Sequence, residues 1–401
     1  MAEYQWQKNI TNITKSIYSQ VLGAEFMAED GNIKAIEAGE LVSIGKDVLD
    51  MDNGLEKMAK AMVVVIGKIV FDDFFGETLR LGQMFTDSWE YGNIYEVVQV
   101  NPQSLITEDL YNLTDGKDYS SVENTYYAPK LTVKVYNNLR TFTLAVSFAR
   151  DRLAVAVQNQ TQLNEVISSI RNQIATQLRE TWYAQALVLL GSAICTSVKT
   201  TKTAIHLLAE AKELGILSNS ATVNDARKDD NFLAFAMRRI ATVREQMKMR
   251  TCAFNNKVVP VATGKVDLYL LNDFEKDTRF GVYRTSYNPD TLDIGTYDVV
   301  QFWQGHKTTD GSTSAITEFT FENNSTVMID DTKNELGIGE SVTVTNVIGL
   351  LCDHKAVAML NQREYVESKY VSSARFWTDF FNMEINPILN PNYSIVAICL
   401  D

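Results

Sequence analysis

Apolar residues recur at steps of three and four in several stretches of the chain, which is the spacing of one helix face. The longest stripe runs from Leu163 to Leu190 and predicts a helix over about residues 159–190, roughly 45 Å long, ending near Gly191. A helix of this length usually spans a whole domain. Shorter stripes that begin at Ile10, Leu55 and Phe232 predict further amphipathic helices.

Other segments carry the pattern of strands. Ile94–Val100 is strand-like, Lys130–Tyr136 alternates strictly between polar and apolar residues, and Leu139–Ala149 is also β-prone. We therefore predict a long two-stranded excursion over residues 76–143, with a polar tip at the Asp115-Gly116 turn signal. A lone hairpin cannot bury its own faces, so this one needs another surface, in this chain or in a neighbouring subunit.

The second half of the chain alternates between helical and strand patterns before it closes with strands. Asp229 or Asp230 is the expected N-cap of the helix at Phe232, and Gly215 is expected to end a short helix at Ala204–Leu214. The remaining predicted segments are the strands Leu268–Leu271, Asp298–Trp303, Val327–Asp330, Val342–Val347, Val347–Cys352, Ala356–Leu360, Glu364–Tyr370, Phe376–Ile385 and Tyr393–Cys399, and a helix at Phe274–Gly281.

Composition and charge narrow the function. The 401 residues are 45% apolar and 22% charged, which excludes wholesale disorder and rod-like folds. The net charge of −13 argues against nucleic-acid binding as the main task. Four scattered cysteines predict no disulfide framework, and no signal-peptide pattern is visible. The longest apolar stretch, Ala61–Phe71, is shorter than the roughly 20 residues that span a bilayer, so we expect no membrane association.

Motifs for catalysis or cofactor binding are missing from the sequence. His206, His306 and His354 lie far apart, in no metal-binding pattern. The segment Gly39–Asp47 resembles a phosphate-binding loop, but its glycine spacing is one residue too long and Asp47 replaces the Ser or Thr that would bind magnesium. We therefore predict no enzyme activity, no catalytic or metal site and no cofactor. Aromatic clusters around Trp89 and Trp377 fit either core packing or subunit contacts.

The order of these elements resembles the Hong Kong 97-type capsid fold of tailed bacteriophages, in particular the major head proteins of small protein-primed podoviruses of Gram-positive bacteria. Three stretches carry the likeness: residues 136–165, from Tyr136 into the long helix; residues 268–274, Leu-Tyr-Leu-Leu-Asn-Asp-Phe; and the closing strands over residues 347–398. The resemblance implies an α+β fold in four parts. These are an N-terminal arm (1–75), an E-loop (76–143), a P-domain with a long spine helix (144–200 and 347–401) and an A-domain (201–346).

The resemblance also implies a function. The chain would be a structural subunit that assembles into pentamers and hexamers of an icosahedral shell, made in the bacterial cytoplasm. That shell would enclose double-stranded DNA without binding it specifically, with scaffolding, portal and decoration proteins as further partners. We expect Asp115, Gly116 and Lys117 at the loop tip to contact a neighbouring subunit, and Ile13 and Ile17 to face another element of the shell. Two alternatives remain open: an encapsulin-like nanocompartment shell, and an acidic cytosolic enzyme without a recognisable motif.

Overall fold

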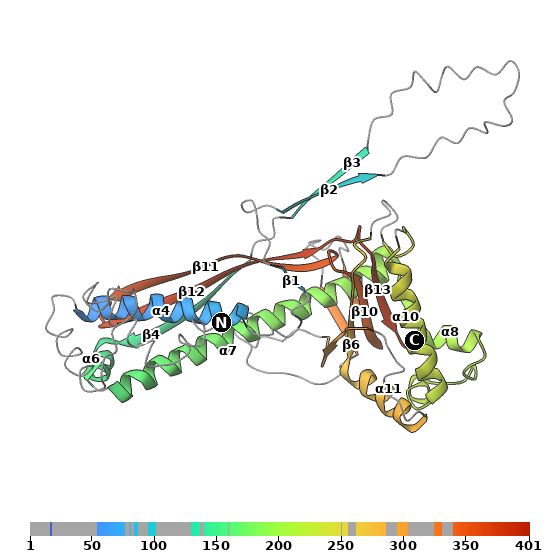
Figure 1. Cartoon of the computed structure of the whole chain (residues 1–401), viewed down its shortest axis with the longest axis horizontal. Coiled ribbons are helices and arrows are strands. Elements are labelled where there is room, and N and C mark those ends of the chain that lie inside the picture. The colour runs from blue at the N-terminus through green and yellow to red at the C-terminus, as the bar shows by residue number, and fades with distance from the viewer. Residues whose placement is uncertain are drawn as a thin grey trace, which may run out of the picture.

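Two β-sheets and one long helix organise the chain (Figure 1). The computed structural model describes residues 17, 54–76, 81, 84–86, 95–101, 130–136, 140–158, 160–249, 251–255, 262–285, 295–303, 325–330 and 340–401. Its helices are α4 (Gly54–Gly76), α6 (Arg150–Gln158), α7 (Gln160–Thr196), the π-helical turn η3 (Ser197–Thr201), α8 (Leu207–Glu213), α9 (Val223–Ala226), α10 (Asp230–Met247) and α11 (Asn272–Thr285). Its strands are β1 (Phe85–Thr86), β2 (Tyr95–Asn101), β3 (Lys130–Tyr136), β4 (Arg140–Ala149), β5 (Ile205–His206), β6 (Val266–Leu271), β7 (Asp298–Val300), β8 (Val327–Asp330), β9 (Ser341–Val344), β10 (Val347–Asp353), β11 (Val357–Val371), β12 (Phe376–Leu389) and β13 (Ile395–Cys399).

The first sheet has the strand order β1-β11-β12-β4, and its long strands β11 and β12 form an antiparallel hairpin. One face of this sheet is apolar because Phe142, Leu144, Val146 and Phe148 alternate along β4 with exposed residues. The helices α4 and α7 pack side by side on that apolar face. Arg140–Thr143, which the sequence pattern assigned to the excursion, instead belong to β4 and pair with β12.

The second sheet has the order β5-β13-β10-β6-β7, with mixed parallel and antiparallel pairing. Strands β10 and β13, which the sequence prediction grouped with the long helix, hydrogen-bond to β6 and β5 of the middle region. The chain therefore returns twice to this sheet, once on each side of the β11–β12 hairpin. Helices α8, α10 and α11 surround a separate hydrophobic cluster with the inner residues of this sheet.

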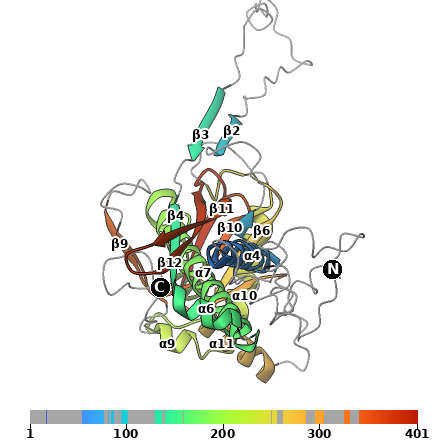
Figure 2. The same ribbon diagram turned by 90° about the vertical axis from the view of Figure 1, so that its left-hand side faces the viewer.

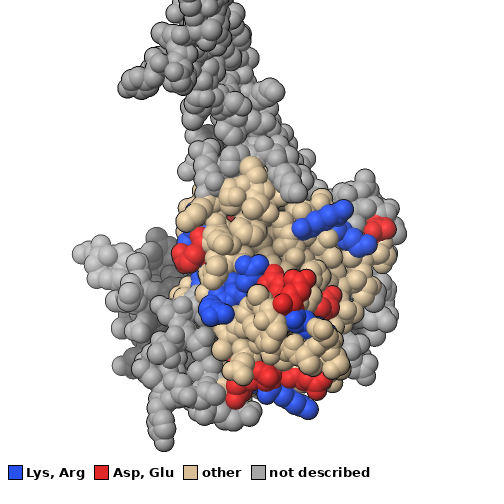
Figure 3. All heavy atoms as spheres, turned by 90° about the vertical axis from the view of Figure 1, so that its right-hand side faces the viewer, with Lys and Arg blue, Asp and Glu red and all other residues tan. Residues whose placement is uncertain are grey.

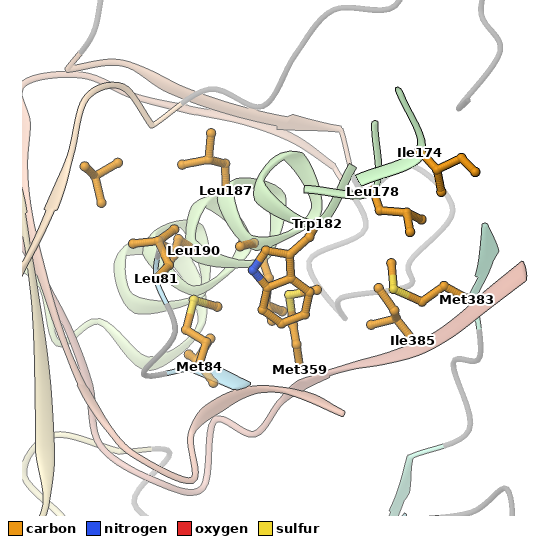
Figure 4. Close-up of a cluster of buried hydrophobic side chains, with 14 of the residues drawn as sticks. Leu81, Met84, Ile174, Leu178, Trp182, Leu187, Leu190, Met359, Met383 and Ile385 are labelled. Carbon is orange, nitrogen blue, oxygen red and sulfur yellow. The ribbon is translucent and has the colours of Figure 1, made fainter. Parts of the chain in front are cut away.

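The long helix α7 joins the two regions. At its middle, Trp182 is 1% exposed and lies among Met359, Ile385 and the side chains of Leu81 and Met84 (Figure 4). The helix was predicted to end near Gly191 but continues to Thr196. Gly191 is an interior position at which a Cβ would lie 3.3 Å from Cγ1 of Val327 on β8. The glycine therefore permits close packing of β8 rather than terminating the helix.

The helix ends instead in the turn η3, where hydroxyl groups bind strand β13. Ser197 Oγ accepts a hydrogen bond from the Ala397 backbone N–H at 2.8 Å, and Thr203 Oγ1 donates to the Ile395 carbonyl at 2.5 Å. Lys202 follows with a φ of 52°, an uncommon left-handed conformation for a residue with a side chain. This turn fixes the junction between the long helix and the second sheet.

Several local predictions are confirmed. Asp229 caps α10 by accepting a hydrogen bond from Phe232 N–H at 2.9 Å, and Gly215 follows α8 with a φ of 71°. Ala356–Leu360 and Glu364–Tyr370, predicted as separate strands, form the single strand β11 with a register shift between Asn361 and Arg363. Cys195, Cys352 and Cys399 are buried free thiols.

One helical segment among the described residues, Gln162–Thr201, is apolar and long enough to cross a membrane by length and composition alone. The sequence pattern instead points to Ala61–Phe71 as the longest apolar stretch. Of its apolar window, 67% is buried inside the protein, which is the pattern of a core helix in a soluble protein. The apolar character of this helix therefore reflects its packing between the two regions.

Candidate assembly surfaces

Two of the three histidines, His206 and His354, each lie beside a carboxylate. His206 Nδ1 lies 2.6 Å from Asp401 Oδ1, and His354 Nδ1 lies 2.8 Å from Asp267 Oδ2. His306 lies outside the described residues. In the part of the chain that the structure describes, no three His, Cys, Asp or Glu side chains gather as they would to hold a metal ion. These pairs join strand ends rather than forming a reaction centre.

Buried ionisable groups between β6, β7 and β10 serve the fold. Asp353 is fully buried and accepts hydrogen bonds from the backbone N–H and the hydroxyl of Thr263, both at 2.8 Å. Burial, together with the nearby charge of Asp267, raises the pKa of Asp298. Elsewhere, near the end of α7, burial raises the pKa of the Cys195 thiol to about 11. Such a thiol stays protonated and unreactive at neutral pH.

The β2–β3 hairpin is the first candidate surface for contact with another subunit. Its antiparallel register places Val98 opposite Val133 and Val100 opposite Leu131. Because positions alternate between faces along a strand, these four share one face, whereas Thr132 belongs to the other. Figure 1 shows the two strands standing clear of the other labelled elements. A two-stranded sheet with one apolar face is at best marginally stable in water, so contact with another surface would stabilise it.

The outer face of the first sheet is a second surface. It carries a polar ladder in which Thr143 Oγ1 donates to Asn382 Oδ1 at 2.6 Å, and the hydroxyls of Ser147 and Thr378 lie 2.9 Å apart. Phe380 is half-buried on the same face, next to Ala145 on β4. This face is flat and mixed in polarity, as in many subunit interfaces.

The end of the molecule formed by α8, α10 and α11 is the third surface. Arg239 binds Glu210 through two hydrogen bonds of 2.8 and 2.9 Å, and Arg227 Nε lies 2.6 Å from Asp277 Oδ2. The hydrogen bond to Glu210 raises the pKa of Arg239. Positive and negative side chains are interspersed over this end (Figure 3), and these two pairs tie its helices together. Phe280 on α11 is nevertheless 66% exposed.

Only one of the predicted contact residues falls within the described structure. Ile17 is helical, 0% exposed and part of the large hydrophobic cluster that includes the long helix. An intersubunit contact through its side chain would therefore require this segment to move. Ile13, Asp115, Gly116 and Lys117 lie outside the described residues, so their contacts stay predictions.

Sequence reasoning missed the apolar face of the hairpin. The alternation of Lys130–Tyr136 was recognised, but Ile94–Val100 alternates less regularly because Val97 and Val98 are adjacent. The strand register then decides which of the two valines joins Val133. Only the pairing of two segments that are 28 residues or more apart gives that register, and no local pattern contains it.

Comparison with known proteins gives one match across the chain. The family model for "Phi29-like phage major capsid protein" matches residues 22–399. Among solved structures, a capsid structure of Staphylococcus phage Andhra is 7% identical, covers 79% of this chain and 83% of that chain, and has a TM-score of 0.47. A structure from native bacteriophage P68 is 9% identical, covers 80% and 85%, and has a TM-score of 0.48. None of the curated protein sequences matches this chain.

Proposed function

This chain belongs to the Phi29-like phage major capsid protein family and is a structural subunit of a phage capsid; from that premise, we propose that it assembles into pentamers and hexamers in which the β2–β3 hairpin of each subunit covers a neighbour. The shell would enclose the phage DNA without binding it specifically. Assembly in the bacterial cytoplasm, and scaffolding, portal and decoration proteins as partners, belong to the same proposal. Neither the nanocompartment nor the enzyme alternative is favoured by this family assignment.

The observation that carries the proposal is the apolar face of the β2–β3 hairpin. The register joins Val98, Val100, Leu131 and Val133 on one face, and this hairpin stands apart from both sheets (Figure 1). An exposed hairpin is a liability for a monomer because its strand edges are open to pairing. In a closed shell the hairpin of every subunit can pack on a neighbouring subunit, which covers its apolar face and its open strand edges.

The four-part division of the chain is retained in this proposal with changed boundaries, because α4 leaves the arm for the P-domain and two closing strands leave the P-domain. We assign the P-domain to the first sheet with α4, α6 and α7, and the A-domain to the second sheet with α8, α10 and α11. Strands β10 and β13 go with the A-domain because they pair with β6 and β5. One face of these strands packs in the cluster of α8, α10 and α11, and the other face packs in the cluster of the long helix, so the strand pairing alone carries this assignment.

The test compares two neighbouring positions on β3 that lie on opposite faces. Val133→Glu adds a charge to the apolar face, whereas Thr132→Glu adds the same charge to the other face. We expect the wild type and Thr132→Glu to form shells, tubes or rings by negative-stain electron microscopy and sedimentation. Val133→Glu should remain as free subunits with an unchanged circular dichroism spectrum. Normal assembly of Val133→Glu would contradict the proposed role of the hairpin.

A further inference from the structure

At the end of the molecule farthest from the second sheet, α6 lies beside the first turns of α7 (Figure 2). An open, largely apolar groove is lined by residues of these two helices. Val155 on α6 and Val166 on α7 form its apolar lining. Val155 is 58% exposed, which is unusual for a valine on a helix packed against another helix. Three charged residues line the same groove: Asp151 and Arg152 on α6, and Glu165 on α7.

Arg152 and Glu165 are opposite in sign. Both side chains are exposed, and among the described residues neither takes part in a hydrogen bond or ion pair. By contrast, several charged residues of the other end are paired, such as Arg239 with Glu210 and Arg227 with Asp277. Because Arg152 lies on α6 and Glu165 on α7, the Arg152 of one copy can meet the Glu165 of a second copy across this groove. Asp151, next to Arg152, leaves each groove with one net negative charge, so the apolar contact and these ion pairs must outweigh that repulsion.

We propose that this groove is a two-fold contact between two copies of the chain. Each copy places Val155 against the Val155 of its partner, and Arg152 of each faces Glu165 of the other. A two-fold axis uses the same patch on both partners, so one groove forms two ion pairs and one continuous apolar contact. The partner is thus a second capsid subunit, and the inference rests on the proposed assembly into a shell.

The local structure suits such a contact. Arg152 and Val155 are three residues apart on α6, so they lie on the same side of that helix. The hairpin turn after β11 lies next to this end, because Arg150 N–H donates to the Arg375 carbonyl at 2.9 Å. The groove is therefore formed by the starts of two helices, α6 and α7, that are already packed together. A second copy can bind without a rearrangement of these helices.

The first test uses disulfide trapping of the proposed axis. Val155→Cys is oxidised both in sedimented particles and in the soluble fraction, and covalent dimers are read on a non-reducing gel. The matched control is Val64→Cys on α4, a valine of almost equal exposure at 56%. We expect covalent dimers from Val155→Cys well above those from Val64→Cys and the wild type. Their absence from both fractions would overturn the inference, whereas an absence of particles by microscopy would speak against the proposed function.

The second test exchanges the charges of Arg152 and Glu165. Arg152→Glu puts two like-charged contacts into each two-fold interface, and we expect it to lower the yield of Val155→Cys dimers about tenfold. Adding Glu165→Arg restores both ion pairs with their charges exchanged and returns the net charge to its original value. The double variant should therefore recover the yield of Val155→Cys dimers that Arg152→Glu alone loses. Both positions are exposed, so each variant should fold. A double variant as poor as the product of the two single effects would contradict the contact.

Discussion

At the scale of single residues, Asp379 on β12 stands out because it is 0% exposed on the apolar face of the first sheet. Among the described residues, no partner reaches either carboxylate oxygen with full hydrogen-bond geometry, although the Ser368 hydroxyl lies close enough to interact weakly. The strand register places it between Ser368 on β11 and Val146 on β4. Burial raises the pKa of Asp379 to about 6, and the nearby Ser368 hydroxyl lowers it by less.

This shift predicts how the stability of the subunit depends on pH. The folded state holds the proton of Asp379 more tightly than the unfolded chain does. Protonated Asp379 therefore contributes its full share to the free energy of unfolding below the unfolded pKa of 3.8. This contribution is lost as the pH rises through about 6. One pKa unit corresponds to about 1.4 kcal/mol, so ionised Asp379 costs about 3 kcal/mol of unfolding free energy at neutral pH.

Asp379→Asn removes this titration and should stabilise the subunit by about 1–2 kcal/mol at neutral pH, because a buried amide also lacks a full set of partners. Near pH 4 the variant and the wild type should unfold at similar urea concentrations. Urea unfolding at both pH values measures the difference, and Glu367→Gln at an exposed position of β11 is the control. Equal stability of Asp379→Asn and the wild type at neutral pH would mean that the carboxyl is not destabilising.

At the scale of elements, the contact of α4 with the first sheet depends on a glycine. A Cβ on Gly67 would lie 2.6 Å from Val366 Cγ2 on β11 and 3.5 Å from Phe381 Cε1 on β12. The backbone of α4 thus approaches the sheet more closely than any residue with a side chain permits. The helical preference of alanine over glycine, about 1 kcal/mol, does not offset such an overlap.

We therefore expect Gly67→Ala to destabilise the subunit by about 1–2 kcal/mol in urea unfolding. Val366→Ala removes the atoms that clash, so the double variant should be more stable than the sum of the single effects implies. The double-mutant cycle is the measurement, and it isolates this contact from the general cost of shortening Val366. Strictly additive effects would show that α4 shifts away from β11 instead.

The long helix shows why some elements are readable from sequence and others are not. Its stripe from Leu163 to Leu190 is a local periodic pattern, so the existence and type of this helix are confirmed by the structure. Its end is different: glycine is common after helices, yet Gly191 is interior because Val327, far along the chain, packs there. The actual end depends on Ser197 and Thr203 binding β13, which is equally remote in sequence.

At the scale of the whole molecule, the same distinction separates the predicted class from the observed topology. The α+β class follows from local patterns and family resemblance, and the structure confirms it. Among the described residues, the hairpin, the long helix and the closing strands also follow one another in the predicted order, whereas the N-terminal arm lies mostly outside these residues and stays a prediction. The split of the closing strands between two sheets was not predictable, because β10 and the first residues of β11, Val357–Leu360, are both apolar and only their strand partners distinguish them. The groove at Val155 was also missed, since an exposed valine has no signature of its own in a sequence.

The net charge of the molecule leads to a prediction about nucleic acid. A chain with a net charge of −13 gains no counterion release from duplex DNA, and two of its arginines on the third surface are already paired with carboxylates. Purified subunits should therefore not retard duplex DNA in a gel-shift assay at about 0.1 M salt, where the screening length is about 10 Å. DNA binding that weakens steeply with salt would instead reveal a basic patch that the net charge conceals.

The same net charge predicts how assembly depends on salt. Assembly should proceed without DNA and improve with added salt, because salt weakens the repulsion between acidic subunits. Light scattering at increasing salt concentrations measures this dependence.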